Sequence, residues 1–83
     1  MRLTVLLFAN LAELIGERSF TIELDDASEP TARTLLDQLI VQHPALEPWT
    51  DRIAIAVDEQ YATRDTVLRD GQTIALIPPV SGG

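Results

Sequence analysis

The hydrophobic residues of this chain change their spacing partway along the sequence. Between residues 31 and 43 they recur at the spacing of one helix face, and Pro44 ends the segment because it cannot continue a helix. Other segments alternate between large apolar and smaller or polar residues, which is the period of a strand with one buried face. The alternating segments are residues 2–9, 19–24, 52–57 and 72–77, with a shorter strand expected at 61–63.

The order strand, strand, helix, strand, strand in so short a chain predicts a single sheet with the helix packed across one face. The first two strands are expected to pair as a hairpin, and the helix then carries the chain to the other edge of the sheet. The first and last strands would then lie parallel in the middle, as in a β-grasp, or ubiquitin-like, sheet. The expected fold class is therefore α+β.

Local signals predict the connections between these segments. Asn10 is expected to cap a short helix, with Glu13 in capping-box register and Gly16 at its end. Residues 25–30 are typical of a polar turn, and residues 45–51 of a loop or a short 3₁₀ turn.

The alternation also predicts which side chains point away from the main helix. The outward sheet face should be small and polar, as contact with solvent requires. Leu6, Phe8 and Ile77 break this pattern, and Tyr61 is expected beside them. An exposed apolar patch of this kind predicts a docking surface. The alternative is that the short helix at residues 10–15 folds over the patch and covers it.

Size and composition exclude several kinds of site. A chain of 83 residues hides only about 60–65% of its unfolded surface, so we expect one domain without a deep active-site cavity. The absence of cysteine excludes disulfides, thiolate metal sites and a thiol nucleophile. No hydrophobic run is long enough to span a bilayer and no signal peptide precedes the first strand, so a cytoplasmic location is expected.

The net charge is −7, with 13 acidic residues against six basic ones. A nucleic acid is therefore a poor partner and a basic protein surface a good one. All six basic residues are arginines. Codon bias would explain the absence of lysine, and so would protection of an activated carboxyl group from attack by side-chain amines.

The last residues predict an extended tail. Two prolines fix φ and remove two N–H donors, so the final strand must stop at Pro78. Residues 78–83 in polyproline geometry would reach roughly 19 Å. We expect a β-grasp domain at residues 1–77 and a slim tail that presents the Gly83 carboxyl group to a partner's active site. The bland alternative is a frayed terminus. The tail consists of Pro78, Pro79, Val80, Ser81, Gly82 and Gly83.

Other candidates for chemistry are weak. His43, the only histidine, is expected at a helix end, and Trp49 is expected to cover the edge of the core. No clustered metal ligands, Gly-rich phosphate loop or nucleophile–base pair is found. The Gly83 carboxylate is a poor electrophile, so it can react only after activation. The chain would then bind no cofactor of its own and act as a substrate or carrier for an ATP-using partner.

Four motifs together resemble the small, sulfur-carrier subunits of molybdopterin synthases over essentially the whole chain. The most specific of them is the tail that starts at Ile77. The motifs are Leu6-Leu7-Phe8-Ala9, Glu13-Leu14-Ile15-Gly16, Leu68-Arg69-Asp70-Gly71 and Ile77-Pro78-Pro79-Val80-Ser81-Gly82-Gly83.

This resemblance implies a mechanism. An adenylyltransferase of the ubiquitin-activating type would use ATP to adenylate the Gly83 carboxylate, and a sulfur donor protein would convert it to a thiocarboxylate. The tail would then enter the large synthase subunit, in a heterotetramer, and donate sulfur to cyclic pyranopterin monophosphate. The resemblance also implies that Phe8, Tyr61 and Ile77 form the patch that docks both partners.

The chain departs from the family at Ala12, Asp58 and Gln72, where an arginine, an asparagine and an aspartate are common. These departures bear on polar contacts with partners and leave the tail unchanged. Two alternatives stay open. One is a sulfur carrier for thiamin thiazole or for tRNA thiolation, and the other is a ubiquitin-like interaction module whose tail is incidental.

Overall fold

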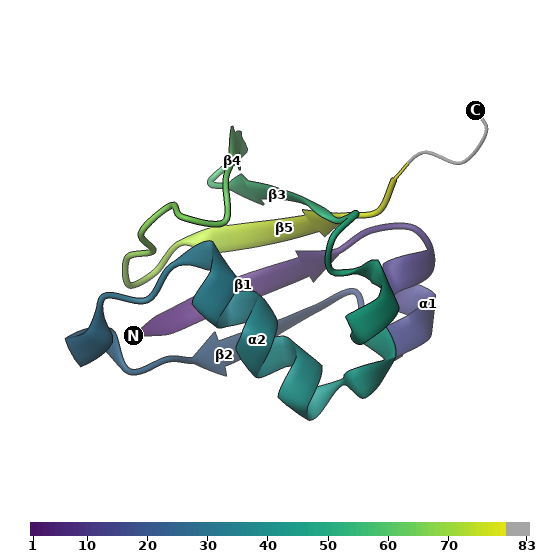
Figure 1. Cartoon of the computed structure of the whole chain (residues 1–83), viewed down its shortest axis with the longest axis horizontal. Coiled ribbons are helices and arrows are strands. Elements are labelled where there is room, and N and C mark those ends of the chain that lie inside the picture. The colour runs from purple at the N-terminus through teal and green to yellow at the C-terminus, as the bar shows by residue number, and fades with distance from the viewer. Residues whose placement is uncertain (80–83) are drawn as a thin grey trace.

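The computed structural model of the chain describes residues 1–79, which form one five-stranded sheet with the helices on one face and at one end (Figure 1). The elements are β1 (Arg2–Leu7), α1 (Asn10–Ile15), β2 (Ser19–Glu23), the 3₁₀ helix η1 (Asp26–Ser28), α2 (Ala32–Gln42), the 3₁₀ helix η2 (Pro44–Trp49), β3 (Ala54–Val57), β4 (Gln60–Ala62) and β5 (Thr73–Ile77).

The strands lie in the order β2-β1-β5-β3-β4. β1 and β5 are side by side in the middle and run parallel, with Val5 opposite Ile74. β2 pairs antiparallel with β1, and β3 pairs antiparallel with both β5 and β4. This is the predicted β-grasp sheet, and the expected α+β class is confirmed.

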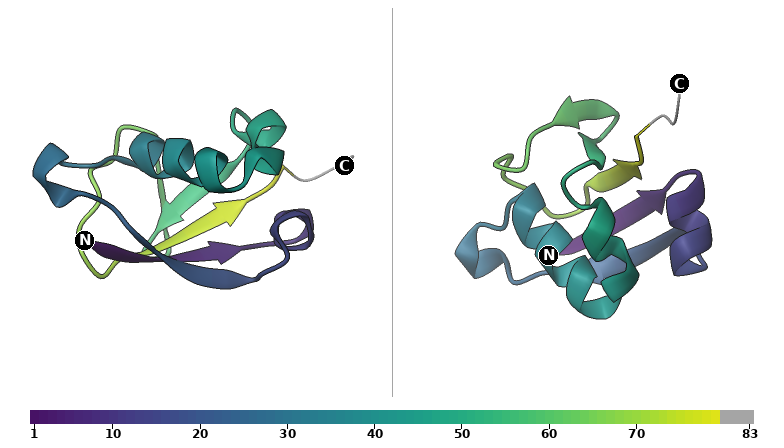
Figure 2. Two further views of the ribbon diagram at one scale, coloured as in Figure 1. Left: turned by 90° about the horizontal axis from the view of Figure 1, so that it is seen from below. Right: turned by 45° about the vertical axis from the view of Figure 1, so that its right-hand side comes forward.

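α2 packs across one face of the sheet, as Figure 2 shows in its left-hand view. Its residues Ala32, Leu35, Leu36 and Leu39 are buried, as the helical spacing predicts. Each buried leucine contributes about 1.5–3 kcal/mol relative to an exposed one, so this contact is a main source of stability. The sheet meets it with a buried layer made of Leu3, Val5, Leu7, Ile22, Ile55, Val57, Ile74 and Leu76.

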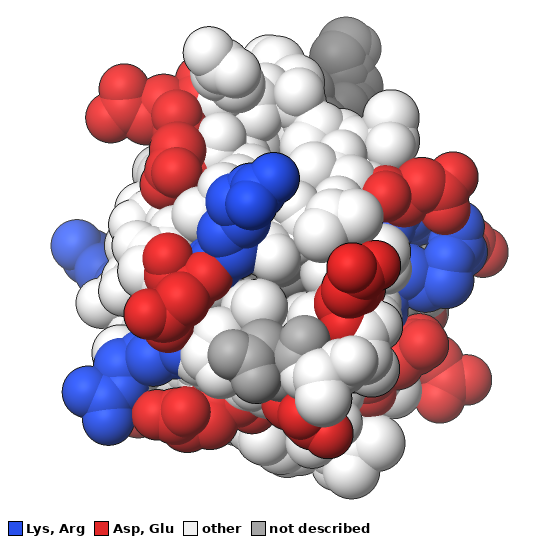
Figure 3. All heavy atoms as spheres, turned by 90° about the vertical axis from the view of Figure 1, so that its left-hand side faces the viewer, with Lys and Arg blue, Asp and Glu red and all other residues white. Residues whose placement is uncertain are grey.

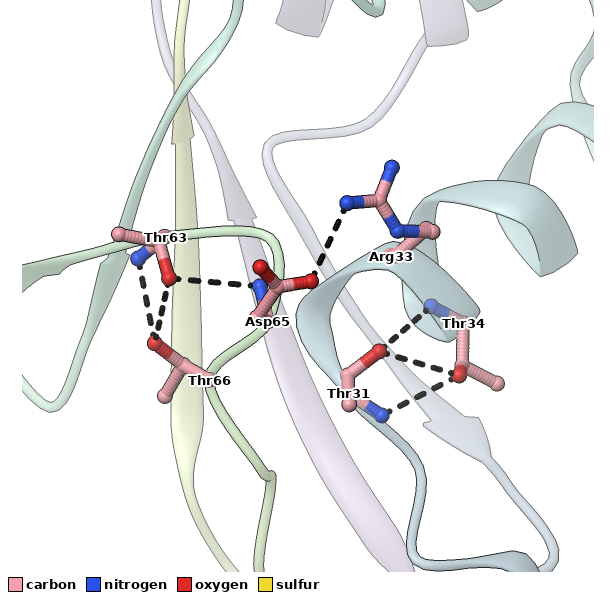
Figure 4. Close-up of polar contacts among 6 residues, drawn as sticks. All are labelled: Thr31, Arg33, Thr34, Thr63, Asp65 and Thr66. Atoms are coloured by element: carbon pink, nitrogen blue, oxygen red, sulfur yellow. Dashed lines mark hydrogen bonds and ion pairs between the residues drawn. The ribbon is translucent and has the colours of Figure 1, made fainter.

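A reciprocal cap starts α2 (Figure 4). The Thr34 backbone N–H donates to the Thr31 hydroxyl oxygen, with the two atoms 3.4 Å apart, and the Thr31 N–H donates to the Thr34 hydroxyl oxygen at 3.2 Å. Two N–H groups that have no partner within the helix are satisfied in this way.

The loop after β4 closes over the same helix end. The backbone N–H groups of Ala32 and Arg33 donate to the carbonyl oxygens of Thr66 and Arg64, at 3.0 and 2.9 Å. Figure 4 shows the Arg33 side chain beside this loop, where it forms an exposed ion pair with Asp65 at 3.2 Å. The helix is therefore tied to a segment 32 residues further along the chain.

Arg64 also holds the entry to β3. Its guanidinium Nη2 donates to the backbone oxygens of Thr50 and Ile53, at 3.1 Å for Ile53. The contact is partly buried, and it fixes the point where the chain leaves η2 and enters the sheet. Sequence patterns predicted no role for this arginine.

Among the differences from the sequence-based expectation, two have a clear local cause. Asn10 is not the cap of α1, because the helix begins at Asn10 and Ala9, at φ 51°, is the preceding cap residue without a side-chain bond. The predicted helix end is confirmed, since Gly16 adopts φ 91°. β3 starts at Ala54 rather than residue 52, because the Ile53 N–H bonds to the Trp49 oxygen and not to a neighbouring strand.

The end of the molecule where the N-terminus lies carries charged groups of both signs. In Figure 3 arginine side chains stand among acidic ones and do not form a continuous basic surface. Within residues 1–79, no helix has the length and apolar content needed to cross a membrane.

We predict that Arg64→Gln lowers the free energy of unfolding by about 1–3 kcal/mol, because two backbone carbonyls lose a charged donor. Arg33→Gln is the matched control: it removes an exposed ion pair and should cost less than about 0.5 kcal/mol. Urea unfolding followed by circular dichroism measures both. Equal effects of the two variants would show that Arg64 does not hold β3.

Candidate docking site on the outward sheet face

One row of residues crosses the sheet on the face opposite α2. Strand pairing places Leu6 of β1 opposite Ala75 of β5, Ala75 opposite Ala56 of β3, and Ala56 opposite Tyr61 of β4. Two methyl groups therefore lie between a leucine and a tyrosine side chain. This alternation of small and large residues hollows the middle of the sheet.

The hollow is a recess of about 540 Å³, which we call the docking recess. Two exposed aromatic side chains stand at its rim, Phe8 with 48% and Tyr61 with 80% of its surface accessible to solvent. The lining consists of Leu6, Phe8, Ala56, Asp58, Glu59, Tyr61, Thr73, Ala75 and Ile77. The predicted cluster of Leu6, Phe8, Ile77 and Tyr61 is thus brought together in space.

α1 does not cover this recess. The residues of α1, all of them described, are outside its lining, and the helix lies beyond the end of the sheet with Leu11 buried. Phe8 and Tyr61 therefore stay accessible, as the docking interpretation requires. The alternative in which the short helix folds over the patch is wrong for this structure.

A second recess, of about 830 Å³, lies where the chain leaves β5, and we call it the tail-root recess. Its lining includes Phe8 and Ile77, which it shares with the docking recess, and also Trp49 and Arg52. The Arg52 guanidinium carbon is 4.8 Å from the centre of the Trp49 ring, a cation–π contact. Trp49 is partly buried against the core, as expected of a residue that covers its edge.

The tail begins at this recess. β5 ends at Ile77, where the two prolines predict that the ladder stops. Pro78 is buried, although the sequence assigned it to the free tail, and Pro79 is exposed. Val80, Ser81, Gly82 and Gly83 lie outside the described residues, so their predicted roles stay predictions.

The β3–β4 turn forms one end of the docking recess. Asp58 and Glu59 join Val57 to Gln60 and have positive φ angles of 47° and 71°, as a two-residue type I′ turn requires. The Asp58 carboxylate accepts a bond from the Thr73 N–H at 2.9 Å. An asparagine oxygen could accept the same bond, so the aspartate at this position preserves the local geometry.

The remaining candidates have structural roles. His43 ends α2, and its ring lies 5.7 Å from that of Phe20 at an angle of 52°. Gln72, another departure from the family pattern, accepts a bond from the Arg69 N–H at 2.6 Å. Within the described part of the chain, no three histidine or carboxylate side chains are grouped as metal ligands.

No sequence pattern assigned Glu59 or Arg52 to the site, and Asp58 was noted only as a departure from the family. The turn itself was predicted, because it lies between two segments with the alternating pattern of strands. The face toward which its carboxylates lie depends on the strand register, which the sequence pattern leaves undetermined.

The fold and the site define a ubiquitin-like β-grasp protein with an apolar recess beside the root of its C-terminal segment. The sequence matches the ThiS family over residues 5–83. The molybdopterin synthase sulfur carrier subunit of Arabidopsis thaliana is 34% identical over 83 residues, which cover 100% of this chain and 84% of that protein.

Two solved structures extend the comparison. SAMP1 from Haloferax volcanii has a TM-score of 0.88 and 33% identity, with 100% of both chains covered. A chain from the complex of subunits 1 and 2 of molybdopterin-converting factor from Helicobacter pylori has a TM-score of 0.66 and 31% identity, again with full coverage. The chain therefore belongs to the ThiS family, and the resemblance to molybdopterin synthase sulfur carrier subunits is confirmed.

We predict that Glu59→Gly raises the free energy of unfolding by about 1 kcal/mol, because glycine adopts a φ of 71° without the steric cost of a Cβ. Glu59→Gln keeps the Cβ and is the control, so its stability should stay close to that of the original chain. Thermal unfolding of the three proteins checks this. A glycine variant that melts below the glutamine variant would contradict the strain at Glu59.

Proposed function

We propose that this chain is the sulfur carrier subunit of a molybdopterin synthase. The observation that carries the proposal is full-length similarity to such subunits combined with an exposed apolar recess at the root of the Gly-Gly segment. A carrier needs two parts: a surface by which it docks and a chain end that reaches another protein's active site. The recess supplies the first, and residues 78–83 are proposed to supply the second.

The proposed chemistry takes place at the Gly83 carboxylate and uses enzymes other than this chain. An adenylyltransferase of the ubiquitin-activating type joins the carboxylate to AMP from ATP and releases pyrophosphate. Sulfur from a donor protein then displaces AMP and leaves a thiocarboxylate. This chain binds no cofactor in the scheme, because ATP is held by the activating partner.

The large synthase subunit is the proposed acceptor. The related chain from Helicobacter pylori is in a complex of subunits 1 and 2 of molybdopterin-converting factor, which supports a large-subunit partner here. The thiocarboxylate sulfur is then transferred to cyclic pyranopterin monophosphate in that subunit. Phe8, Tyr61 and Ile77 are the proposed docking residues for both partners, in a heterotetrameric synthase. The cytoplasmic location expected from the sequence stays a prediction.

A covalent protein modifier is the second candidate. The small archaeal modifier protein 1 of Haloferax volcanii is 35% identical over 85 residues, which cover 93% of this chain. A modifier and a carrier would both need an activated Gly83, but they differ in the acceptor. A modifier forms an amide with a protein amine, whereas a carrier gives up sulfur to a small molecule.

We predict that incubation with an adenylyltransferase of this type, ATP and a sulfur donor exchanges one oxygen for one sulfur at Gly83. Intact-mass analysis detects the change, and deletion of Gly83 should abolish it while leaving partner binding intact. Sulfur transfer that survives the deletion would refute the carrier proposal. Stable amide adducts with other proteins, in place of sulfur transfer to the pyranopterin, would favour the modifier.

We also predict that Ala75→Leu weakens binding to the large synthase subunit about tenfold, because a larger side chain fills the docking recess. Thr21→Leu adds similar apolar volume on an exposed part of β2 away from the recess and should leave the dissociation constant unchanged. Isothermal titration calorimetry measures both. Equal affinities for the two variants would place the docking surface elsewhere.

A further inference from the structure

Glu59 occupies a backbone conformation that disfavours its side chain. Its φ of 71° is in the left-handed region, where a residue with a Cβ costs of order 1 kcal/mol relative to glycine. Glu59 is exposed, and among the described residues no hydrogen bond or ion pair holds its carboxylate. Its neighbour Asp58, by contrast, accepts a bond from the Thr73 N–H. The Glu59 carboxylate is therefore available to a partner, whereas the Asp58 carboxylate is already bonded within the fold.

The position of Glu59 indicates which chemical group its carboxylate can bind. With Asp58 it lines one end of the docking recess, next to Thr73 at the start of β5. The tail leaves from the other end of β5, four residues and about 13 Å further along the strand. There the tail-root recess contains Arg52. Negative charge therefore lies at the far end of the docking surface and positive charge at the end where the tail departs.

We propose that Glu59, together with Asp58, binds a lysine or arginine side chain of the docking partner, next to the apolar side chain that fills the recess. The proposal rests on the proposed function and adds the chemistry of the partner's surface. A cation held at the Glu59 end orients the partner, so that its active-site entrance lies at the opposite end, where the tail leaves. Charge complementarity of this kind selects partners and increases the rate of encounter.

Charge also decides against a second copy of this chain as the occupant. Two copies would each bring a net charge of −7 to the contact and would repel one another at low ionic strength. The docking recess itself is lined by two carboxylates and, within the described residues, by no basic side chain. A basic partner surface is the chemistry that fits.

The test is the affinity of Glu59→Lys for the purified large synthase subunit of the same organism, measured by titration calorimetry at low and at high salt. Glu29→Lys is the matched control, because Glu29 is also exposed, also has a positive φ of 51°, and undergoes the same change in charge. It lies beside Leu68 and Arg69, away from the docking recess.

We expect Glu59→Lys to weaken binding about fivefold or more at low salt, with a smaller difference at high salt because ions screen the contact. Glu29→Lys should stay within about twofold of the original chain. Glu59→Gly should also bind more weakly while unfolding at a higher temperature, which separates lost binding from lost folding.

The outcomes distinguish this inference from the proposed function. If the original chain binds the large subunit and delivers sulfur, but Glu59→Lys binds as well as Glu29→Lys, the inference is overturned and the carrier function stands. If the original chain does not bind the large subunit at all, both are overturned. A loss of affinity confined to the Glu59 variants and reduced by salt supports the inference.

Discussion

The parallel pairing of β1 with β5 is the contact on which the rest of the structure depends. Parallel strands end at the same edge of a sheet, so the chain leaving β1 at Phe8 and the chain leaving β5 at Pro78 emerge side by side. An antiparallel pair would have placed these two ends at opposite edges. The docking recess and the root of the tail therefore adjoin because of strand direction, and Phe8 and Ile77 line both recesses.

The recess itself results from register. Ala75 and Ala56 stand opposite one another in the middle of the sheet, with Leu6 and Tyr61 on either side. A shift of one residue in any of these pairings would bring buried aliphatic side chains to the surface, so the core that packs against α2 holds the recess in place. Arg64 also helps to keep the recess in place, because it holds the start of β3, and β3 carries Ala56 at the bottom of the recess.

If the β3–β4 turn binds a partner as proposed, stability and recognition make opposite demands on it. A tight two-residue turn favours glycine, whereas Asp58 and Glu59 place two carboxylates at the end of the recess. The Asp58 carboxylate accepts a hydrogen bond from the Thr73 N–H, which offsets part of the steric cost of its positive φ. Glu59 makes no such bond among the described residues. In our proposal, binding of a cation of the partner is what this turn gains in return for the conformational cost at Glu59.

Periodicity by itself determined the β-grasp class, the buried stripe of α2 and the end of β5 at Ile77, because these depend on local spacing and on proline's missing N–H. The capping pattern wrongly made Asn10 the cap of α1, whereas the helix begins at Asn10 and Ala9 is the cap residue. Only the tertiary structure decided that α1 leaves the apolar patch open, that Pro78 is buried, and that Glu59 and Arg52 lie at opposite ends of the site. Those facts depend on register and on contacts between distant segments, which no local pattern encodes.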